Sequence, residues 1–204
     1  MQKRSRETRH RILNTALELF SHTGYETSSV AEICQAAGVS KGAFYHHFPS
    51  KQAVFMELLQ TWLDMLDEQI KRAQLEAENV PQALLNIAGL MQQVFQQASG
   101  RLPMFLEFWT QASHDPVIWQ VVIAPYQRFQ EYFRFLIQIG ITEGSLRDEN
   151  PEAASRALVA MGGGLLLMGV LETQEEKRAS MPTESIKILL NGLVLQRKVE
   201  LKAK

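Results

Sequence analysis

The segment from Ser28 to Lys51 constrains the fold of this chain more than any other part of its sequence. Ser29 is followed three residues later by Glu32, which is the spacing of a capping box, and apolar residues then recur at the interval of a helix. Gly38 can adopt the left-handed conformation that ends a helix, and Ser40 can cap a second helix. The sequence therefore predicts two short helices joined by a tight turn, as in a helix-turn-helix.

The second of these helices has one apolar face and one face of small and polar residues. At about 100° per residue, Phe44 and Phe48 lie within about 40° of each other and should be buried. Gly42, Ala43 and His46 then face outward. Because residues 42 and 43 are small, the backbone can come close to a partner, and His46 can reach the edge of a base in a DNA groove.

Residues beside this outward face suit the DNA backbone. Tyr45 and His47 flank it and Lys51 follows the helix, so each can meet a phosphate at the side of the groove. A metal site at His46 and His47 is a weak alternative, because adjacent helical residues point about 100° apart and no acidic or cysteine residue follows four positions later. We expect no metal and no cofactor.

An amphipathic helix is predicted ahead of this segment, over residues 8–22, and Gly24 ends it. Its beginning and the residues before it carry a group of cations: Lys3, Arg4, Arg6, Arg9 and Arg11. Such a basic arm can reach a phosphate strand or the minor groove. The alternative is a solvated, frayed tail.

From Arg11 to about Leu59 the chain closely resembles the DNA-binding domain of TetR-family transcriptional regulators. The residues that carry the resemblance are Ala16, Leu19, Phe20, Gly24, Tyr25, Val30, Ile33, Ala37, Gly38, Val39, Ser40, Lys41, Gly42, Phe44, Tyr45, His46, His47, Phe48 and Lys51. The resemblance implies an all-α fold, with an N-terminal three-helix, helix-turn-helix DNA-binding domain and a C-terminal helical domain for ligand binding and dimerisation. We expect the domains to be residues 1–51 and 52–204.

The resemblance also assigns roles within the DNA-binding domain. The family's phosphate contacts fall on Ser28 or Ser29, and on Tyr45, His47 and Lys51. Its base-reading positions fall on Lys41, Gly42, Ala43 and His46, and Ser40 completes the candidate DNA-binding set. Two positions depart from the family: Cys34 replaces a small, alanine-like residue, and Ala43 replaces a polar residue that can read a base in other members. A lone cysteine on a buried helical face is more often a core residue than a redox sensor.

Charge is distributed unevenly along the chain. Residues 1–51 hold seven Lys/Arg and four Asp/Glu, whereas residues 52–204 hold fourteen and eighteen, so the two parts carry +3 and −4. This asymmetry is consistent with DNA bound at one end only. The single cysteine excludes a disulfide within the chain, no signal peptide is evident, and the uncharged run over residues 157–171 is too short to span a membrane, so a buried helix is expected there. We therefore expect a cytoplasmic protein without a membrane segment.

Helical patterns follow one another through the remainder of the chain. We expect helices over residues 52–78, 81–100, 102–113, 117–139, 151–175 and 182–198. The first can join the two domains and act as a lever between ligand and DNA, although its periodicity is equally that of a plain core helix.

Small residues, among them Gly162, Gly163 and Gly164, line the helix predicted over residues 151–175. Because each glycine costs about 1 kcal/mol relative to alanine in a helix, we expect another helix to approach closely there. A homodimer through residues 151–198 would supply that helix, and close packing within one subunit is the alternative.

Aromatic and methionine side chains of the middle helices are candidates for an effector pocket: Trp62, Met91, Phe95, Phe105, Trp109, Trp119 and Phe129. Their spacing is also that of an ordinary helical core. Few acidic residues share these faces, which favours a neutral or anionic lipophile over a strongly cationic ligand.

Together these patterns favour a homodimeric, ligand-responsive transcriptional regulator. The simplest form is a repressor that leaves a palindromic double-stranded operator when a small apolar effector binds. A transcriptional activator, or a DNA-binding protein without an effector, is the nearest alternative. A helical enzyme has little support, because the sequence contains no Ser/His/Asp constellation, glycine-rich phosphate loop or metal-ligand spacing.

Overall fold

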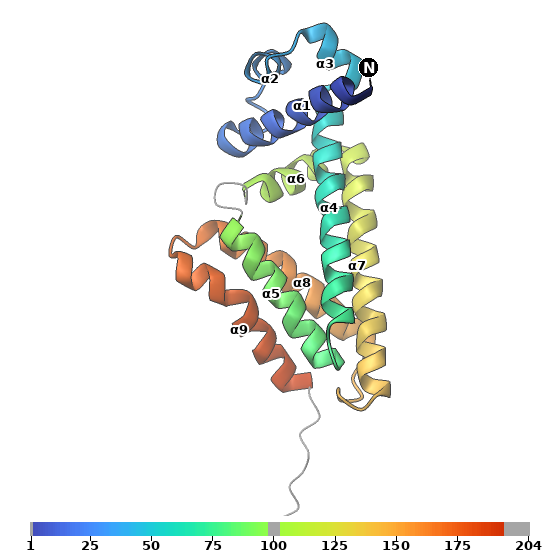
Figure 1. Cartoon of the computed structure of the whole chain (residues 1–204). Coiled ribbons are helices and arrows are strands. Elements are labelled where there is room, and N and C mark those ends of the chain that lie inside the picture. Colours follow the sequence, from blue (N-terminus) through green and yellow to red (C-terminus); the bar gives the residue numbers. More distant parts are fainter. Residues whose placement is uncertain (1, 98–102, 194–204) are drawn as a thin grey trace, which may run out of the picture. The chain divides into compact units, whose positions relative to one another are not determined.

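The computed structural model describes residues 2–97 and 103–193, which form nine α-helices and divide between two compact units (Figure 1). The first unit comprises Met1–Glu68 and Gln97–Pro125, and the second comprises Gln69–Gln96 and Tyr126–Lys204. Helices are the only regular elements of the described residues, so the predicted all-α fold is confirmed. The domain boundary after residue 51 lies inside the first unit and stays a prediction.

The first unit is built around three N-terminal helices. It contains α1 (Gln2–Thr23), α2 (Val30–Ala37), α3 (Lys41–His47), the first part of α4 (Lys51–Leu75), α6 (Pro103–His114) and the beginning of α7 (Pro116–Thr142). Helix α1 contacts α2 and α6, and α2 contacts α3. The core is aromatic: the ring centroids of Tyr25 and Phe55 lie 4.4 Å apart, and those of Phe20 and Tyr25 lie 5.2 Å apart. Phe44 and Phe48 are 0% and 2% exposed, as predicted.

The ends of α2 and α3 agree with the sequence signals. In the capping box, the Ser29 hydroxyl accepts from the Glu32 N–H at 3.2 Å, and the Glu32 carboxylate accepts from the Ser29 N–H at 2.7 Å. Hydrogen bonding to Ser29 holds the pKa of Glu32 below its ordinary value. Gly38 ends α2 with a φ of +62°, and the Ser40 hydroxyl caps α3 by accepting from the Ala43 N–H at 3.1 Å. Local hydrogen bonds therefore define both helices of the helix-turn-helix.

The second unit contains the end of α4, nearly all of α5 (Val80–Gln97), the rest of α7, α8 (Pro151–Leu171) and α9 (Glu175–Leu193). The Tyr132 hydroxyl on α7 donates to the Gln74 side chain on α4 at 2.8 Å. After α7 the chain turns back so that Leu146 packs on Gly140 in the last turn of the helix, where an added Cβ would lie 2.6 Å from Cδ1 of Leu146. A side chain at position 140 would therefore displace Leu146, which is buried.

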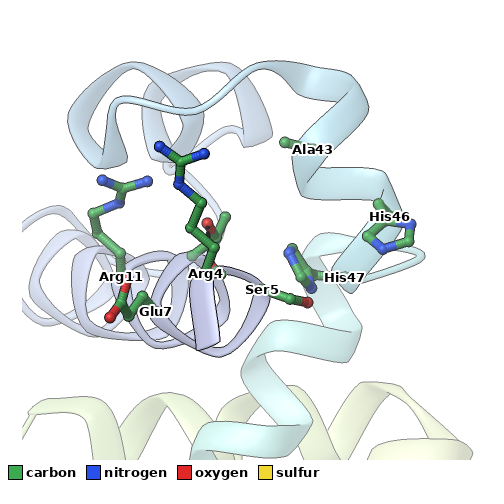
Figure 2. A pocket seen from close by; sticks show the side chains of 8 residues that line it. Arg4, Ser5, Glu7, Arg11, Ala43, His46 and His47 are labelled. Carbon is green, nitrogen blue, oxygen red and sulfur yellow. Dashed lines mark hydrogen bonds between the residues drawn. The ribbon is translucent and has the colours of Figure 1, made fainter. Parts of the chain in front are cut away.

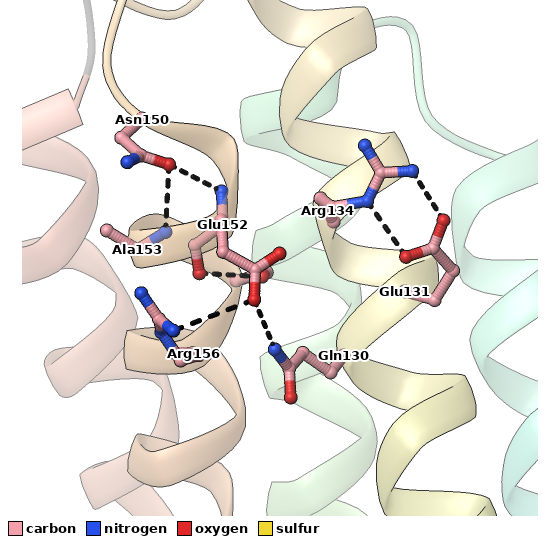
Figure 3. Close-up of polar contacts among 8 residues, drawn as sticks. Gln130, Glu131, Arg134, Asn150, Glu152, Ala153 and Arg156 are labelled. Atoms are coloured by element: carbon pink, nitrogen blue, oxygen red, sulfur yellow. Dashed lines mark hydrogen bonds and ion pairs between the residues drawn. The ribbon is translucent and has the colours of Figure 1, made fainter.

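Helix α8 is held to α7 by side chains near its beginning (Figure 3). The Asn150 side-chain oxygen caps α8 by accepting from the N–H groups of Glu152 and Ala153 at 3.0 and 3.3 Å. Gln130 on α7 donates to the Glu152 carboxylate at 2.7 Å. This cap and this contact fix the start of α8 but extend over its first turn only.

Farther along, α8 keeps an apolar face that the described residues do not cover. Leu167, Met168 and Leu171 are 45%, 50% and 65% exposed. A Cβ added to any of the glycines at positions 162–164 would meet no atom within 4 Å in the part of the chain described here. Among the described residues, these glycines therefore serve no close packing, and both the dimer interface and packing within one subunit stay predictions.

The prediction that the apolar run in α8 is buried holds only in part. Ser155, Leu158, Leu165 and Gly169 are buried, but only 22% of the most apolar window of α8 is buried in the chain. By length and composition alone α8 could cross a membrane, although one such helix is weak evidence for a span.

Helix α9 begins at Glu175, not at Pro182 as the sequence suggested. Pro182 lies inside the helix and is among the fully buried side chains. The prediction was wrong because it took the proline for a helix start. Glu175 and Glu176 mark the true start, since their negative charges lie at the positive end of the helix dipole.

Candidate nucleic-acid interface

Helix α3 presents an outward face that the described residues leave largely uncovered. Its exposed members are Lys41, Gly42, Tyr45 and His46, while Ala43 and His47 are half-buried. Tyr45 is 54% exposed. An added Cβ at Gly42 would contact only the Ser40 hydroxyl, at 3.8 Å, so a partner can approach the backbone there. The base-reading and phosphate roles of these residues stay predictions.

Helices α1 and α3 together form an open cleft of about 460 Å³ beside this face (Figure 2). Its walls are Arg4, Ser5, Glu7, Thr8 and Arg11 on α1, and Ala43, His46 and His47 on α3. Glu7 is the one acidic side chain of this lining. Within the described residues, neither the guanidinium of Arg4 nor that of Arg11 has a hydrogen-bond or ion-pair partner. We call this feature the α1–α3 cleft.

The basic arm is helical and not a frayed tail, because α1 begins at Gln2. One of its cations, Arg9, is used inside the unit. The Arg9 guanidinium forms two hydrogen bonds with the Glu57 carboxylate on α4 and lies 4.9 Å from the centroid of the Phe48 ring. Arg9 therefore ties α1 to α4 and to the end of α3. No spacing rule in the sequence links residues so far apart.

The two serines at the start of α2 differ in exposure. Ser28 is 3% exposed, and its hydroxyl donates to the Gly24 carbonyl at 2.7 Å and lies 2.9 Å from the Thr23 hydroxyl. Ser29 is exposed. Because the Ser28 hydroxyl is buried and bonded inside the unit, Ser29 is the more accessible of the two candidates, and a phosphate contact at either serine stays a prediction.

Lys51, a predicted phosphate contact, is bonded to the chain itself. Its ammonium donates to the carbonyls of Tyr25 and Ser28 at 2.7 and 2.9 Å, and the Glu26 carbonyl lies at 3.4 Å. It also lies 4.1 Å from the centroid of the Tyr25 ring. An ammonium has three N–H donors, so these three carbonyls use its full capacity. A phosphate contact by Lys51 stays a prediction and would have to replace one of these bonds.

The imidazole rings of His46 and His47 are neighbours, with centroids 5.1 Å apart. Burial, followed by the proximity of His46 and Arg9, lowers the pKa of His47. The described residues hold no group of three or more His, Cys, Asp or Glu side chains that could bind a metal ion.

Cys34 lies in the core of the helix-turn-helix and is 5% exposed. Burial raises the pKa of its thiol, and nearby Lys41 opposes this effect only in part. Because the thiolate is the reactive form, this environment favours a core role over redox sensing.

Two hydrogen bonds that the sequence did not predict join α6 and the start of α7 to the N-terminal helices. Gln52, in the first turn of α4, donates to Asp115 at 2.6 Å, and Gln111 on α6 donates to Glu26 at 2.8 Å. The second oxygen of Asp115 caps α7 by accepting from the Val117 N–H at 2.7 Å. Asp followed by Pro at a helix start is a recognisable cap signal, but nothing in the sequence pairs Asp115 with Gln52.

The candidate pocket residues are distributed over both units. Trp62, Trp109 and Trp119 belong to the first unit, and Met91 and Phe129 belong to the second. Trp109 and Trp119 are 49% and 42% exposed, whereas Trp62, Met91 and Phe129 are half-buried. The side chains of Phe95 and Phe105 lie outside the part of the chain whose side chains are described. Their role in a pocket stays a prediction.

Comparison with known proteins gives matches over both halves of the chain. The family of bacterial regulatory proteins named tetR matches residues 12–58, and the C-terminal domain of BetI-type transcriptional repressors matches residues 82–191. The HTH-type transcriptional regulator UidR of Escherichia coli (strain K12) is 23% identical over 195 residues, which are 95% of this chain and 96% of UidR. The HTH-type transcriptional regulator AcrR of Shigella flexneri is 46% identical over 57 residues, which are 28% of this chain and 26% of AcrR.

Solved structures share the fold over nearly the whole length. The crystal structure of a putative transcriptional regulator from Saccharomonospora viridis in complex with choline superposes with a TM-score of 0.82. Its sequence is 21% identical, and the match covers 93% of this chain and 99% of that one.

Proposed function

We propose, since the chain belongs to the TetR family of bacterial transcriptional regulators and carries a C-terminal domain of the BetI repressor type, that it represses transcription as a homodimer on a palindromic operator. The observation that carries the proposal is the uncovered outward face of α3 beside the cationic α1–α3 cleft. An effector bound by the C-terminal helices shifts the dimer towards a state with lower DNA affinity. We place this activity in the cytoplasm, where the DNA is.

Within each DNA-binding domain we divide the contacts by chemistry. Lys41, Gly42, Ala43 and His46 meet base edges in the major groove, whereas Ser29, Tyr45 and His47 meet phosphates on either side. The caps at Ser29 and Ser40 support this division, because they set the start of both helices before DNA is bound. Lys51 holds the connection between α1 and α2. When DNA binds, a phosphate replaces one of the three carbonyls to which its ammonium donates.

The test is selection of duplexes from a random DNA library by the purified dimer, repeated with His46→Ala. We expect the wild-type protein to select a palindrome, and His46→Ala to lose preference at one or two base pairs per half-site, each worth about 1–3 kcal/mol. His22→Ala is the matched control, because His22 lies in the last turn of α1 and does not line the α1–α3 cleft. An unchanged profile with His46→Ala assigns His46 to no base, and selection of no sequence by the wild-type protein contradicts the proposed function.

The homodimer is supported by the uncovered face of α8. Leu171 is 65% exposed, and Ile188 on α9 is 75% exposed. Exposed large apolar side chains on two neighbouring helices are a surface that a second protein chain can cover. A second copy of α8 and α9 would cover it in a four-helix interface and would bring another helix close to Gly163.

A route from effector to DNA is supported by the bonds of Gln52 and Gln111. Both connect the segment of α6 and early α7, which carries Trp109 and Trp119, with residues next to α2 and α3. Movement of this segment on effector binding would break or strain these bonds. The two states of the regulator then differ in whether Asp115 holds the first turn of α4.

Gln52→Met tests this route, because it removes the bond to Asp115 but leaves the cap of α7 in place. We expect the ratio of DNA affinities with and without effector to change by about fivefold or more, which is the lower range of allosteric coupling. Gln60→Met is the matched control, since Gln60 is an exposed α4 residue bonded to Asp64. An unchanged ratio for Gln52→Met removes Asp115 from the route.

For the effector we propose a small lipophile, neutral or anionic, that contacts the exposed tryptophans. Choline is a second candidate, because tryptophan faces attract quaternary ammonium groups and a protein of the same fold was solved with choline. Titration of tryptophan fluorescence with decanol, decanoate and choline separates these classes. We expect Trp109→Ala to weaken DNA release by the active compound and to leave DNA binding of the free dimer intact. Loss of operator binding without any compound would make Trp109 a structural residue.

A further inference from the structure

We propose that the α1–α3 cleft holds one phosphate of the DNA backbone and that His47 takes up a proton when this phosphate enters, so that operator affinity falls as pH rises. The inference rests on the proposed function in one respect, that α3 binds DNA. It adds a pH dependence located at one residue of that surface.

The cleft has the charge that a phosphate needs. Arg4 and Arg11 are permanent cations on one wall, and Glu7 is the one acid of the lining. Arg9, by contrast, is neutralised by Glu57 and contributes little net attraction. Two guanidinium groups without a partner among the described residues and two imidazoles therefore line one open cleft that can attract an anion (Figure 2).

His47 is the side chain in this cleft whose charge is poised to change. It is half-buried, the charged groups that act on it are Arg9 on α1 and His46 on its own helix, and Arg4 and Arg11 line the same cleft. The acids nearby are Glu7 on α1 and Glu57 on α4, and the second is bonded to Arg9. Burial and this cationic surrounding lower the pKa of His47 in the free protein. At neutral pH the ring is therefore uncharged before DNA arrives.

A phosphate in the cleft should raise the pKa of His47, because an anion beside an imidazole favours the imidazolium form. The folded, DNA-bound state then holds a proton that the free state does not hold. By linkage, affinity increases as pH falls and is lost as pH rises between the lowered pKa of the free protein and the raised pKa of the complex. The dependence amounts to at most about one log unit of affinity per pH unit for each DNA-binding domain, since no more than one proton is taken up.

At most one proton per DNA-binding domain is expected, although two histidines are adjacent. A positive charge on His46 disfavours the imidazolium form of His47, because the two ring centroids lie only 5.1 Å apart. His47 is the half-buried member and faces the arginines, whereas His46 is exposed and free to meet a base. The pH dependence should therefore follow His47, and the base preference should follow His46.

The experiment measures proton uptake by the full-length dimer on the palindrome obtained by selection. Isothermal titration at pH 7 in buffers of different ionisation enthalpy gives the number of protons bound, and NMR of selectively labelled histidines gives the pKa of His47 with and without DNA. We expect the His47 pKa to rise by about one unit or more, an uptake of about half a proton or less per DNA-binding domain for each one-unit rise, and loss of both effects in His47→Gln. His22→Gln is the matched control and should keep the wild-type uptake.

A parallel series with Arg4→Ala tests the phosphate itself. The slope of log affinity against log salt concentration should flatten by about one unit, and proton uptake should fall because His47 loses its anion. Proton uptake that persists in His47→Gln, or a His47 pKa that does not rise on DNA binding, overturns the inference while DNA binding by the protein stands. If the wild-type dimer binds no duplex, the proposed function fails instead.

Discussion

The helix-turn-helix buries its large apolar side chains within one chain, whereas the α8–α9 pair leaves several of them exposed. In the helix-turn-helix, Phe44 and Phe48 are 0% and 2% exposed, and hydrogen bonds cap the starts of α2 and α3. In α8 and α9, Leu171 and Ile188 remain 65% and 75% exposed. The first region is complete within one chain, whereas the second needs a surface that this chain alone does not supply. Mutations should therefore act on folding in the first region and on assembly in the second.

The largest effect is expected in the core of the helix-turn-helix. Phe44→Ala removes a fully buried ring and should lower the free energy of unfolding by about 3–5 kcal/mol. Ile188→Ala, in the exposed face of α9, should change the stability of the subunit by about 0.5 kcal/mol or less. Urea denaturation of both variants at several protein concentrations measures the free energy of unfolding of the subunit and checks this difference. If both variants lost similar subunit stability, the proposed difference between the helix-turn-helix and the α8–α9 pair would be contradicted.

Gly163→Leu tests whether a second copy covers α8. Overpacking costs about 1–3 kcal/mol per contact, so the dimer should dissociate at least about tenfold more readily and operator binding should weaken with it. Gly89→Leu on α5 is the matched control, because an added Cβ there also meets no atom of the described chain within 4 Å. Analytical ultracentrifugation and operator titration measure both consequences. A Gly163→Leu protein that stays dimeric and binds normally moves the interface elsewhere.

Ser29→Ala should have an intermediate effect. The change removes a helix cap and should destabilise the helix-turn-helix by about 1 kcal/mol, and it should also remove a phosphate contact. Ser29→Asp keeps the cap but repels the phosphate, so thermal denaturation and DNA titration of both variants separate the two roles. A Ser29→Asp protein that binds DNA as tightly as the wild type would leave Ser29 with the cap alone.

The smallest effect concerns Cys34. Because burial raises the pKa of its thiol, little thiolate forms at pH 8, and a disulfide reagent should modify Cys34 slowly in the native protein and rapidly in denaturant. Operator titration after mild oxidation with hydrogen peroxide is the companion measurement, and we expect no change. Rapid modification with loss of DNA binding would establish Cys34 as a redox sensor.

The sequence predicted the features that depend on neighbours in the chain. The capping box of Ser29 and Glu32 and the buried face of Phe44 and Phe48 follow from spacing alone, and both are confirmed. The sequence did not reveal the bonds of Arg9 to Glu57 or of Gln52 to Asp115, since these partners are far apart along the chain. It also misplaced the start of α9, because a buried proline within a helix carries the same signal as one at its beginning.

The three carbonyls held by Lys51 have a consequence for chemical modification of this protein. Acetylation would convert the ammonium into a neutral amide with one N–H donor, so at least two of these carbonyls would lose their partner. It would also remove the cation from above the Tyr25 ring. The connection between α1 and α2 would become less ordered, and the position of Ser29 at the start of α2 would be less well fixed. Modification of this one lysine would therefore weaken DNA binding by disturbing the position of α2, without changing the charge of α3.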